Sequence, residues 1–148
     1  MSSLAIRDIA LDPSRLTQHL VDSHCGGFVS FEGWVRNHNE GKAVVRLEYE
    51  VYTPIAVSEG EQIIAEAMDR FEIGRAYCEH REGELALGDL AVWVGVAAAH
   101  RGPAFDACQY IIDNVKTRLP IWKKEHYENG DSGWVNCEGC AAHGHAHG

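Results

Sequence analysis

Apolar and polar residues alternate along two stretches in the first third of the chain. Residues 28–36 and 42–52 both follow the period of two that is typical of a strand with one buried face, and a turn-rich segment ending at Gly41 separates them. Two such runs around a short glycine-containing loop predict an antiparallel hairpin with Arg36 at its mouth. In the second run, the face expected to be buried consists of Val45, Leu47, Tyr49 and Val51.

Proline positions and an apolar period of three to four residues predict helices in three places. The first covers residues 13–22, the second begins at Thr53-Pro54, with Thr53 as its N-cap, and the third covers 103–119. The apolar stripes of the second and third helices are Ile64, Ala67, Met68 and Phe71, and Ala104, Cys108, Ile111 and Val115. Further strands are expected over 4–9, 75–81, 89–98 and 121–127. Paired strands interrupted by helices indicate an α+β fold with a mainly antiparallel sheet.

Length and composition predict one ordinary domain. The chain has 148 residues, and its 45% hydrophobic and 24% charged residues exclude wholesale disorder. We expect the domain to cover residues 1–136 and a flexible Cys- and His-rich tail to follow at 137–148, because the tail contains nothing from which a core is built. No secretory signal is visible and no apolar run is long enough to span a bilayer, so a cytoplasmic protein without membrane attachment is expected.

Charge is distributed unevenly along the chain. The net charge of −9 argues against a general nucleic-acid or anionic-membrane binder. Residues 100–124 nevertheless hold five basic and two acidic side chains, a net +3, whereas the rest of the chain carries −12. A basic window in an acidic protein predicts a localised anion site, and the alternative interpretation is a solvated basic face.

Three groups within this window could carry chemistry. His100 and Arg101 stand where a strand leads into a helix, and the N–H groups and dipole of a helix N-terminus favour an anion. Lys116 borders the apolar stripe of that helix, where it either snorkels to solvent or presents an amine whose pKa desolvation lowers enough to react. In the strand that follows, alternation places Lys123 on one face and Lys124 on the other.

The tail combines residue types that bind zinc, namely Cys137, Cys140, His143 and His145. The loop between the two pairs is far shorter than in ordinary zinc modules, so the alternative is a flexible tail that binds metal opportunistically. Five cysteines in a chain without a signal argue against a disulfide framework.

Four sequence runs, taken together, resemble one family. They are FVSFEGWVRNHNEG (28–41), LEYEVYTPIA (47–56), AHRGPAFDACQYIIDNVKTRLPIWKKEHY (99–127) and GDSGWV (130–135). Their order over about residues 26–135 resembles the large, catalytic subunit of molybdopterin synthase. The resemblance implies an α+β fold of the α/β-hammerhead type, with two to three helices.

The resemblance also implies an enzyme, a sulfurtransferase of molybdenum cofactor biosynthesis. Sulfur would come from the thiocarboxylate on the C-terminal Gly-Gly of a small ubiquitin-like subunit. It would be added to cyclic pyranopterin monophosphate to form the molybdopterin dithiolene. Two large subunits would form a homodimer within a heterotetramer. The family implies no required cofactor, and zinc at the tail lies outside its pattern.

Matching motifs imply roles for individual residues. Lys116, which matches a lysine beside the partner's terminal glycine, and Lys123 are the expected catalytic residues. The substrate-binding residues implied by the resemblance are Trp34, Val35, Arg36, His100, Arg101, Lys116, Lys123, Lys124 and Glu125. After Val135 the sequence departs from the family pattern, so no role is carried over there.

Two other classes of function stay open at this point. One is a metal (zinc) carrier or sensor that acts through the tail, and it predicts stoichiometric zinc that is lost when the chain is truncated after Val135. The other is a non-catalytic module that uses the same basic pocket, and it predicts binding of the phosphorylated pterin without any chemistry.

Overall fold

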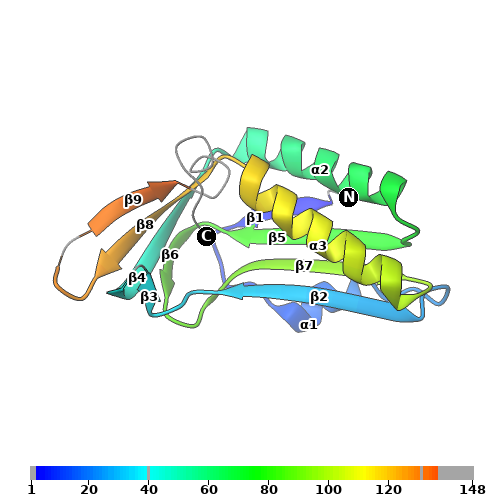
Figure 1. The fold of residues 1–148 in the computed structure, drawn as a ribbon, viewed down its shortest axis with the longest axis horizontal. Helices are drawn as coiled ribbons and strands as arrows, with labels where there is room; N and C mark the ends of the chain where they lie inside the picture. Colours follow the sequence, from blue (N-terminus) through cyan, green and yellow to red (C-terminus); the bar gives the residue numbers. More distant parts are fainter. Residues whose placement is uncertain (1–2, 40, 131, 137–148) are drawn as a thin grey trace.

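The computed structural model describes residues 3–39, 41–130 and 132–136, which form two sheets and three helices (Figure 1). The strand order in the first sheet is β1 (Leu4–Arg7), β5 (Arg75–Arg81), β7 (Leu90–Ala98) and β2 (Gly27–Trp34). The second contains β3 (His38–Asn39), β4 (Lys42–Val51), β8 (Ile121–Tyr127) and β9 (Ser132–Asn136), with β6 (Gly83–Ala86) also paired to β4. Among these described strands only β1 and β5 pair in parallel, so the predicted α+β class with a mainly antiparallel sheet is confirmed.

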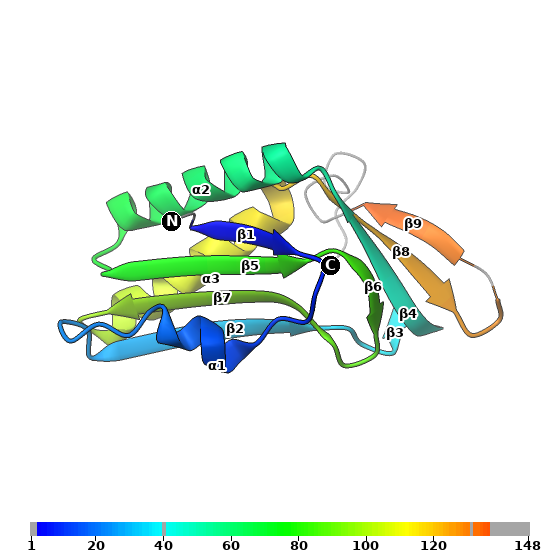
Figure 2. The same ribbon diagram turned by 180° about the vertical axis from the view of Figure 1, so that it is seen from behind.

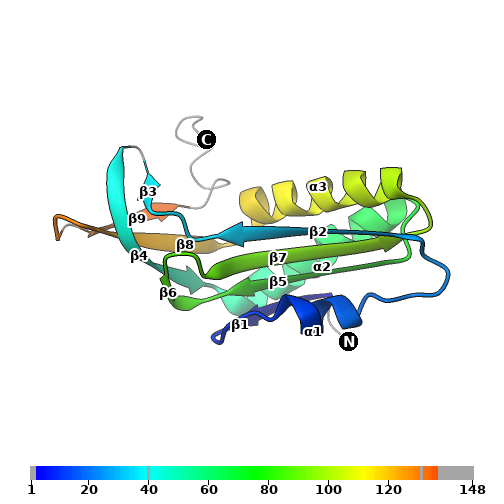
Figure 3. The ribbon, with the colours of Figure 1, turned by 90° about the horizontal axis from the view of Figure 1, so that it is seen from below.

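Helices cover both faces of the first sheet (Figures 2 and 3). The long helices α2 (Thr53–Arg70) and α3 (Arg101–Arg118) lie side by side on one face, and the short α1 (Pro13–Gln18) lies on the other. Between them β7 is buried from Ala91 to Ala98, because a strand covered on both faces needs a continuous apolar sequence. Within the described part of the chain, no helix is both long and apolar enough to cross a membrane.

The cores of the two sheets meet at Tyr49. The main core lies between the first sheet and the two long helices, and it includes the whole predicted stripe of α3: Ala104, Cys108, Ile111 and Val115. A smaller core beside the second sheet contains Val35, Leu47 and Leu85. The half-buried Tyr49 packs against both cores, so it marks the junction between the sheets.

The predicted hairpin between residues 28–36 and 42–52 is wrong. β2 pairs with β7 along its length, beginning with Gly27 opposite Ala98, and β4 pairs with β8 and β6. What remains of the hairpin is the short strand β3 beside the start of β4. Alternation determines which face of a strand is buried, but it does not identify the neighbouring strand. Here β7, which is apolar on both faces, is the neighbour.

The buried face of β4 changes at a β-bulge. The register against β8 shifts between Val44 and Arg46, so that Val44 is buried and Val45 is exposed. The prediction that Val45 is buried is therefore wrong. Beyond the bulge, Leu47 is buried and Tyr49 is half-buried, as the alternation predicted.

Several element ends differ from the prediction by a few residues. α1 ends at Gln18, α3 begins two residues ahead of Pro103, and Tyr52 instead of Thr53 precedes α2 as its N-cap. Proline is tolerated throughout the first turn, where the N–H groups have no partner within the helix, so its position does not define the first residue. Met68, predicted in the stripe of α2, is exposed. β6 and β9 are too short to show a period in the sequence.

Polar contacts between the two long helices centre on Arg118. Its guanidinium lies 2.7 Å from the Glu59 carboxylate and 2.6 Å from that of Glu66. The Tyr110 hydroxyl donates a further 2.6 Å hydrogen bond to Glu66. These hydrogen bonds, led by those from Arg118, lower the pKa of Glu66 from 4.5 to about 2. Arg118 therefore belongs to the helix packing, although it lies in the basic window of the sequence.

We expect a Glu66→Gln variant to be less stable than the parent chain at neutral pH, and this difference to shrink on acidification. The lowered pKa means that the Glu66 carboxylate stabilises the folded chain fully above about pH 4.5, and that this contribution disappears as the pH falls towards 2. Thermal unfolding of both chains at neutral pH and at about pH 3 measures the difference. Glu72→Gln, at an exposed position after α2, is the control. A gap in melting temperature that stayed constant with pH would contradict the prediction.

Candidate active site

β8 presents a lysine and a buried acid on one face. The Lys123 ammonium lies 4.0 Å from the Glu125 carboxylate, which is 2% exposed. The Tyr127 hydroxyl donates a 2.9 Å hydrogen bond to the same carboxylate. Lys124 points to the opposite face, where its ammonium lies 5.6 Å from the centre of the Trp134 ring. The two neighbouring lysines therefore have different surroundings, as the alternation predicted.

Tyr49 and His80 extend this cluster towards the first sheet. Tyr49 of β4 is directly opposite Lys123 in the register with β8. The ring of His80, from β5, meets the Tyr49 ring edge-on, with 5.0 Å between the ring centres. Burial, together with the negative charge of Glu125, raises the pKa of Tyr49 to about 12. The Tyr49 hydroxyl therefore keeps its proton at neutral pH.

Lys116 approaches the same cluster from α3. It is exposed and follows the buried Val115, so it borders the apolar stripe as predicted. Burial lowers the pKa of His80 to about 4, and the ammonium of Lys116 is close enough to add to this effect. Lys116 is thus within electrostatic range of His80, His80 contacts Tyr49, and Tyr49 pairs with Lys123.

Three further predicted residues lie at and after the end of β2. Trp34 is exposed, and its indole N–H donates a 3.1 Å hydrogen bond to Glu32. Val35 is buried in the core of the second sheet, and its backbone N–H binds the carbonyl of Asp89 at 3.0 Å. Arg36 is exposed and comes directly after this anchored valine.

His100 and Arg101 lie at the opposite end of α3 from Lys116. His100 is the N-cap and Arg101 the first residue of the helix, and both are exposed. At 1.5 Å per residue, the helix separates Arg101 from Lys116 by about 22 Å along its axis. One copy of the chain thus places Lys123 beside Glu125 and Lys116 within electrostatic range of His80, and it leaves His100 and Arg101 at the far end of α3. The role of the His100–Arg101 pair stays a prediction.

The four candidate zinc ligands, Cys137, Cys140, His143 and His145, lie outside the described residues. Within residues 3–39, 41–130 and 132–136, no three His, Cys, Asp or Glu side chains are grouped so that they could hold a metal ion. Zinc binding by the tail therefore stays a prediction from the sequence.

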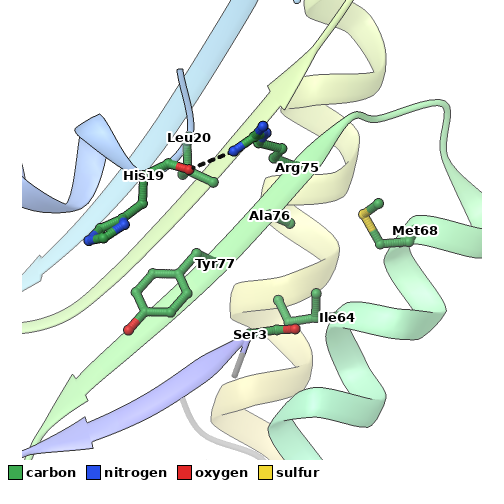
Figure 4. Close-up of a pocket in the computed structure, with 8 residues that line it drawn as sticks. All are labelled: Ser3, His19, Leu20, Ile64, Met68, Arg75, Ala76 and Tyr77. Carbon is green, nitrogen blue, oxygen red and sulfur yellow. Dashed lines mark hydrogen bonds between the residues drawn. The ribbon is translucent and has the colours of Figure 1, made fainter. Parts of the chain in front are cut away.

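A pocket of about 330 Å³ is formed by the segment after α1, by α2 and by the start of β5 (Figure 4). It lies apart from the lysine cluster, which consists of Lys116, Lys123, Glu125, Tyr49, His80 and Tyr127. Its lining residues are Ser3, His19, Leu20, Ile64, Met68, Arg75, Ala76 and Tyr77. The Arg75 guanidinium donates hydrogen bonds to the His19 carbonyl at 3.3 Å and to Asp22 at 3.2 Å. None of the predicted site residues lines this pocket and its arginine already has a carboxylate partner, so we assign it no ligand.

Sequence reasoning missed three residues of the lysine cluster: Tyr49, His80 and Tyr127. The alternation predicted that Tyr49 lies on the buried face of its strand. A polar hydroxyl on that face is the feature by which the sequence could have identified Tyr49 as a site residue. His80 lies two residues after the buried Cys78, so both side chains are on the same face of β5, and a histidine on that face was the available signal. A polar side chain on a buried strand face indicates either an internal hydrogen bond or a site.

Fold and cluster together define a class of protein. It is an α+β protein in which the amine of Lys123 and a buried carboxylate lie beside Tyr49, at the junction of two sheets. Such groups bind anions and move protons during group transfer.

Comparison with known proteins identifies the family. The model of the MoaE protein family matches residues 6–118. The molybdopterin synthase catalytic subunit of Synechococcus elongatus is 46% identical over 119 residues, which cover 78% of this chain and 72% of the relative. The chain belongs to the MoaE protein family.

Two solved structures share the fold. Molybdopterin synthase from Staphylococcus aureus matches with a TM-score of 0.86 and 32% identity over 92% of this chain and 98% of that one. A complex of subunits 1 and 2 of the molybdopterin-converting factor from Helicobacter pylori matches with a TM-score of 0.74 and 21% identity over 91% of this chain and 90% of that one. The resemblance seen in the sequence, the hammerhead-type fold and the enzyme class, a sulfurtransferase of molybdenum cofactor biosynthesis, are confirmed.

Proposed function

We propose that this chain, as the catalytic subunit of a molybdopterin synthase, transfers sulfur from the thiocarboxylated C-terminus of a small ubiquitin-like subunit to cyclic pyranopterin monophosphate. The product would be the dithiolene of molybdopterin. The observation that carries this proposal is the pairing of Lys123 with the buried Glu125 on β8, in a chain of the MoaE family whose second predicted lysine, Lys116, lies within electrostatic range of the nearby His80.

The lysine cluster suits the chemistry of a thiocarboxylate. The sulfur attacks a pterin carbon and displaces an oxygen substituent, which leaves with the bonding electrons and takes up a proton. Water then attacks the glycine carbonyl and breaks its bond to sulfur, so that the sulfur stays on the pterin and the glycine leaves as a carboxylate. Negative charge develops on the carbonyl oxygen and protons have to move. The ammonium groups of Lys116 and Lys123 are suited to stabilise that charge and transfer those protons. Glu125 holds Lys123 in position, and Arg36 offers a guanidinium for the substrate phosphate.

A small partner subunit is consistent with the comparisons. The Helicobacter pylori structure is a complex of two subunits of the molybdopterin-converting factor. In this chain Lys116 is exposed at the end of α3, so an incoming peptide terminus would reach its amine without rearrangement of the core. The docked tail would then remove water from the cluster and strengthen its electrostatic interactions.

A homodimer would bring the remaining predicted residues to the site. Among the described strands β2 has a neighbour on one side only, so its other edge is open. Exposed aromatic side chains lie along this edge, on β2 itself and on α3, which packs over it: Phe28, Phe31, Trp34 and Phe105. Long apolar edges of this kind favour pairing with a second copy.

The helical period supports a particular arrangement of two copies. At about 100° per residue, Arg101, Phe105 and Lys116 lie within about 60° of one another on α3. This side faces away from α2, which contacts α3 through Tyr110 and Arg118. A two-fold axis through the middle of this side sets two α3 helices antiparallel. In this arrangement, Arg101 and His100 of the second copy of this chain lie opposite Lys116 of the first copy.

We expect Phe105→Asp to dissociate this homodimer, because it puts a charge into an apolar contact. Phe105 is 59% exposed in the single chain. Ile9→Asp is the matched control, since Ile9 is 60% exposed but follows β1, at the opposite edge of the sheet. Light scattering should give twice the 16.4 kDa chain mass for the parent chain and for Ile9→Asp, and a single chain mass for Phe105→Asp. A dimeric Phe105→Asp would contradict the arrangement.

Reconstitution tests the proposed activity. The purified chain is mixed with the small subunit carrying a C-terminal Gly-Gly thiocarboxylate and with cyclic pyranopterin monophosphate, and the dithiolene product is measured by mass spectrometry. The small subunit with an ordinary carboxylate is the control and should yield no product. Absence of dithiolene with the thiocarboxylate would refute the proposal, and binding of the pterin without chemistry would favour the non-catalytic alternative.

Two predictions from the sequence accompany this proposal without a structural test. Zinc binding at Cys137, Cys140, His143 and His145, and with it a role as metal carrier, concerns residues outside the described part of the chain. The cytoplasmic location is the setting that we propose for a biosynthetic enzyme of this family. Neither enters the argument for sulfur transfer.

A further inference from the structure

Glu125 lies between a lysine and a tyrosine on one face of β8. Lys123 comes two residues before it and Tyr127 two residues after it, so all three side chains point to the same side of the sheet. In register, the neighbours of Glu125 on the adjoining strands are Leu47 of β4 and Gly133 of β9, and neither has a polar side-chain atom. A carboxylate that is 2% exposed needs polar partners, and the lysine and the tyrosine supply two of them.

The two partners face different oxygens of the Glu125 carboxylate. The Tyr127 hydroxyl donates a 2.9 Å hydrogen bond to Oε1. The Lys123 ammonium lies 4.0 Å from Oε2, which is close enough for an ion pair but too far for a hydrogen bond. The ring of Tyr127 packs against the core of the second sheet, and this contact fixes the position of its hydroxyl. The hydroxyl therefore determines how the carboxylate is turned towards the amine.

We propose that Tyr127 is a positioning residue for Lys123 that acts through Glu125. Its hydroxyl restrains the carboxylate, so that the ammonium lies beside a negative charge but keeps its N–H groups for the reacting thiocarboxylate. This inference rests on the proposed function, in which the Lys123 ammonium stabilises charge and transfers protons. Without the hydroxyl, the buried carboxylate would lose a donor, and the flexible lysine side chain is near enough to replace it.

The chain contains a second tyrosine–glutamate pair, which serves the fold. On β5 the Tyr77 hydroxyl donates a 2.7 Å hydrogen bond to Glu79, which is also two residues away and is fully buried. The Glu79 carboxylate pairs with arginines of β1 and α1, so it links three elements. The ion pair of Lys123 with Glu125 lies within one strand and joins no second element to it. Since a buried ion pair by itself contributes little net stability, this difference favours a role at the site for the pair on β8.

Removal of one hydroxyl group tests the proposal, and the pair on β5 supplies a matched control. Tyr127→Phe keeps the ring in the core and removes only the donor to Glu125. We expect it to lower kcat about 10-fold with little change in KM for the pterin, because the carboxylate draws the Lys123 amine away from the reacting atoms. Tyr77→Phe makes the same deletion at the other buried glutamate. It should lower the melting temperature and leave kcat within twofold of the parent chain.

A measurement that needs neither partner nor substrate accompanies the kinetics. The pKa of the Lys123 amine is followed by nitrogen NMR, with the signal assigned through its loss in Lys123→Arg. This pKa should be about one pH unit higher in Tyr127→Phe, because a carboxylate at hydrogen-bond distance stabilises the ammonium more than one at 4.0 Å. It should be unchanged in Tyr77→Phe. Glu125 on the same strand and Tyr49 opposite on β4 are kept in all of these chains, so neither substitution removes a titratable neighbour of the amine.

A double variant tests whether Tyr127 acts through Glu125. In the Glu125→Gln background the charge that draws the amine is absent, so Tyr127→Phe should have almost no further effect on kcat. An equal loss of kcat in that background, kcat of Tyr127→Phe within twofold of the parent chain, or a Lys123 pKa that does not rise would overturn the proposal. If the parent chain makes no product with the thiocarboxylated small subunit, the sulfur-transfer function fails, and the Lys123 pKa still decides whether Tyr127 positions this amine.

Discussion

Replacing Lys116 by alanine should reduce kcat about 100- to 10,000-fold while leaving the fold intact. The side chain is exposed, so its removal leaves no cavity. It supplies one of the two amines of the cluster, and loss of a positioned proton donor or acceptor has effects of this size. The variant is assayed for dithiolene formation with the thiocarboxylated small subunit, and its melting temperature is measured in parallel.

Two further variants define what the Lys116 amine contributes. Lys116→Arg keeps the positive charge but cannot give up its proton near neutral pH. It should therefore be as inactive as Lys116→Ala if the amine reacts or transfers a proton, and active if only its charge matters. Asp113→Ala, an exposed position one turn earlier on α3, is the control and should keep full activity. Turnover within a few-fold of the parent chain in Lys116→Ala would show that this lysine is not catalytic.

Replacing Glu79 by alanine should produce a large loss of stability. Its carboxylate is fully buried and lies 3.4 Å from Arg7 Nε and 3.1 Å from Arg15 Nη2, and it accepts a 2.7 Å hydrogen bond from the Tyr77 hydroxyl. One side chain of β5 thereby links this strand to its neighbour β1 and to α1. Burial and the bond to Glu79 also raise the pKa of Tyr77 to about 12.

The expected loss of stability depends on the two arginines that lose their carboxylate partner in Glu79→Ala. Removing one partner of a buried ion pair typically costs about 3–5 kcal/mol. Both arginine side chains are 42% exposed and regain water, so we expect a value near the lower end, about 3 kcal/mol, or a melting temperature lower by roughly 6–12 °C. Glu79→Gln keeps a hydrogen-bond acceptor, so its melting temperature should lie between those of the parent chain and Glu79→Ala. Glu72→Ala, at an exposed position, should change little. A melting temperature of Glu79→Ala within about 2 °C of the parent chain would contradict this account.

Local periodicity predicted those features that depend on residues close in sequence. The stripe of α3, from Ala104 to Val115, is buried as its spacing indicated. The opposite orientations of Lys123 and Lys124 on β8 are also as predicted. In both cases the backbone geometry of one element determines the direction of each side chain. The sequence motifs in addition identified the family, which the comparisons confirm.

Strand pairing could not be predicted in the same way. The prediction joined residues 28–36 to 42–52 because they are adjacent in sequence and both alternate. In the folded chain, β2 lies beside β7 and β4 beside β8. Period two is common to β2 and β4, and β7 is apolar on both faces, so the pattern does not identify which strand pairs with which. The bulge that exposes Val45 is likewise visible only once β8 is paired with β4.

The amino-acid sequence by itself determined the α+β class, the two long helices and the residue types available for chemistry, since each follows from local periodicity or from motifs. Only the tertiary structure decided that Lys123 lies opposite Tyr49, that Tyr49 contacts His80 within electrostatic range of Lys116, and that His100 and Arg101 lie at the far end of α3. The physical reason is that the residues of the lysine cluster come from four elements, α3, β4, β5 and β8. Their juxtaposition results from burial of the two cores, which depends on contacts between residues far apart in the chain.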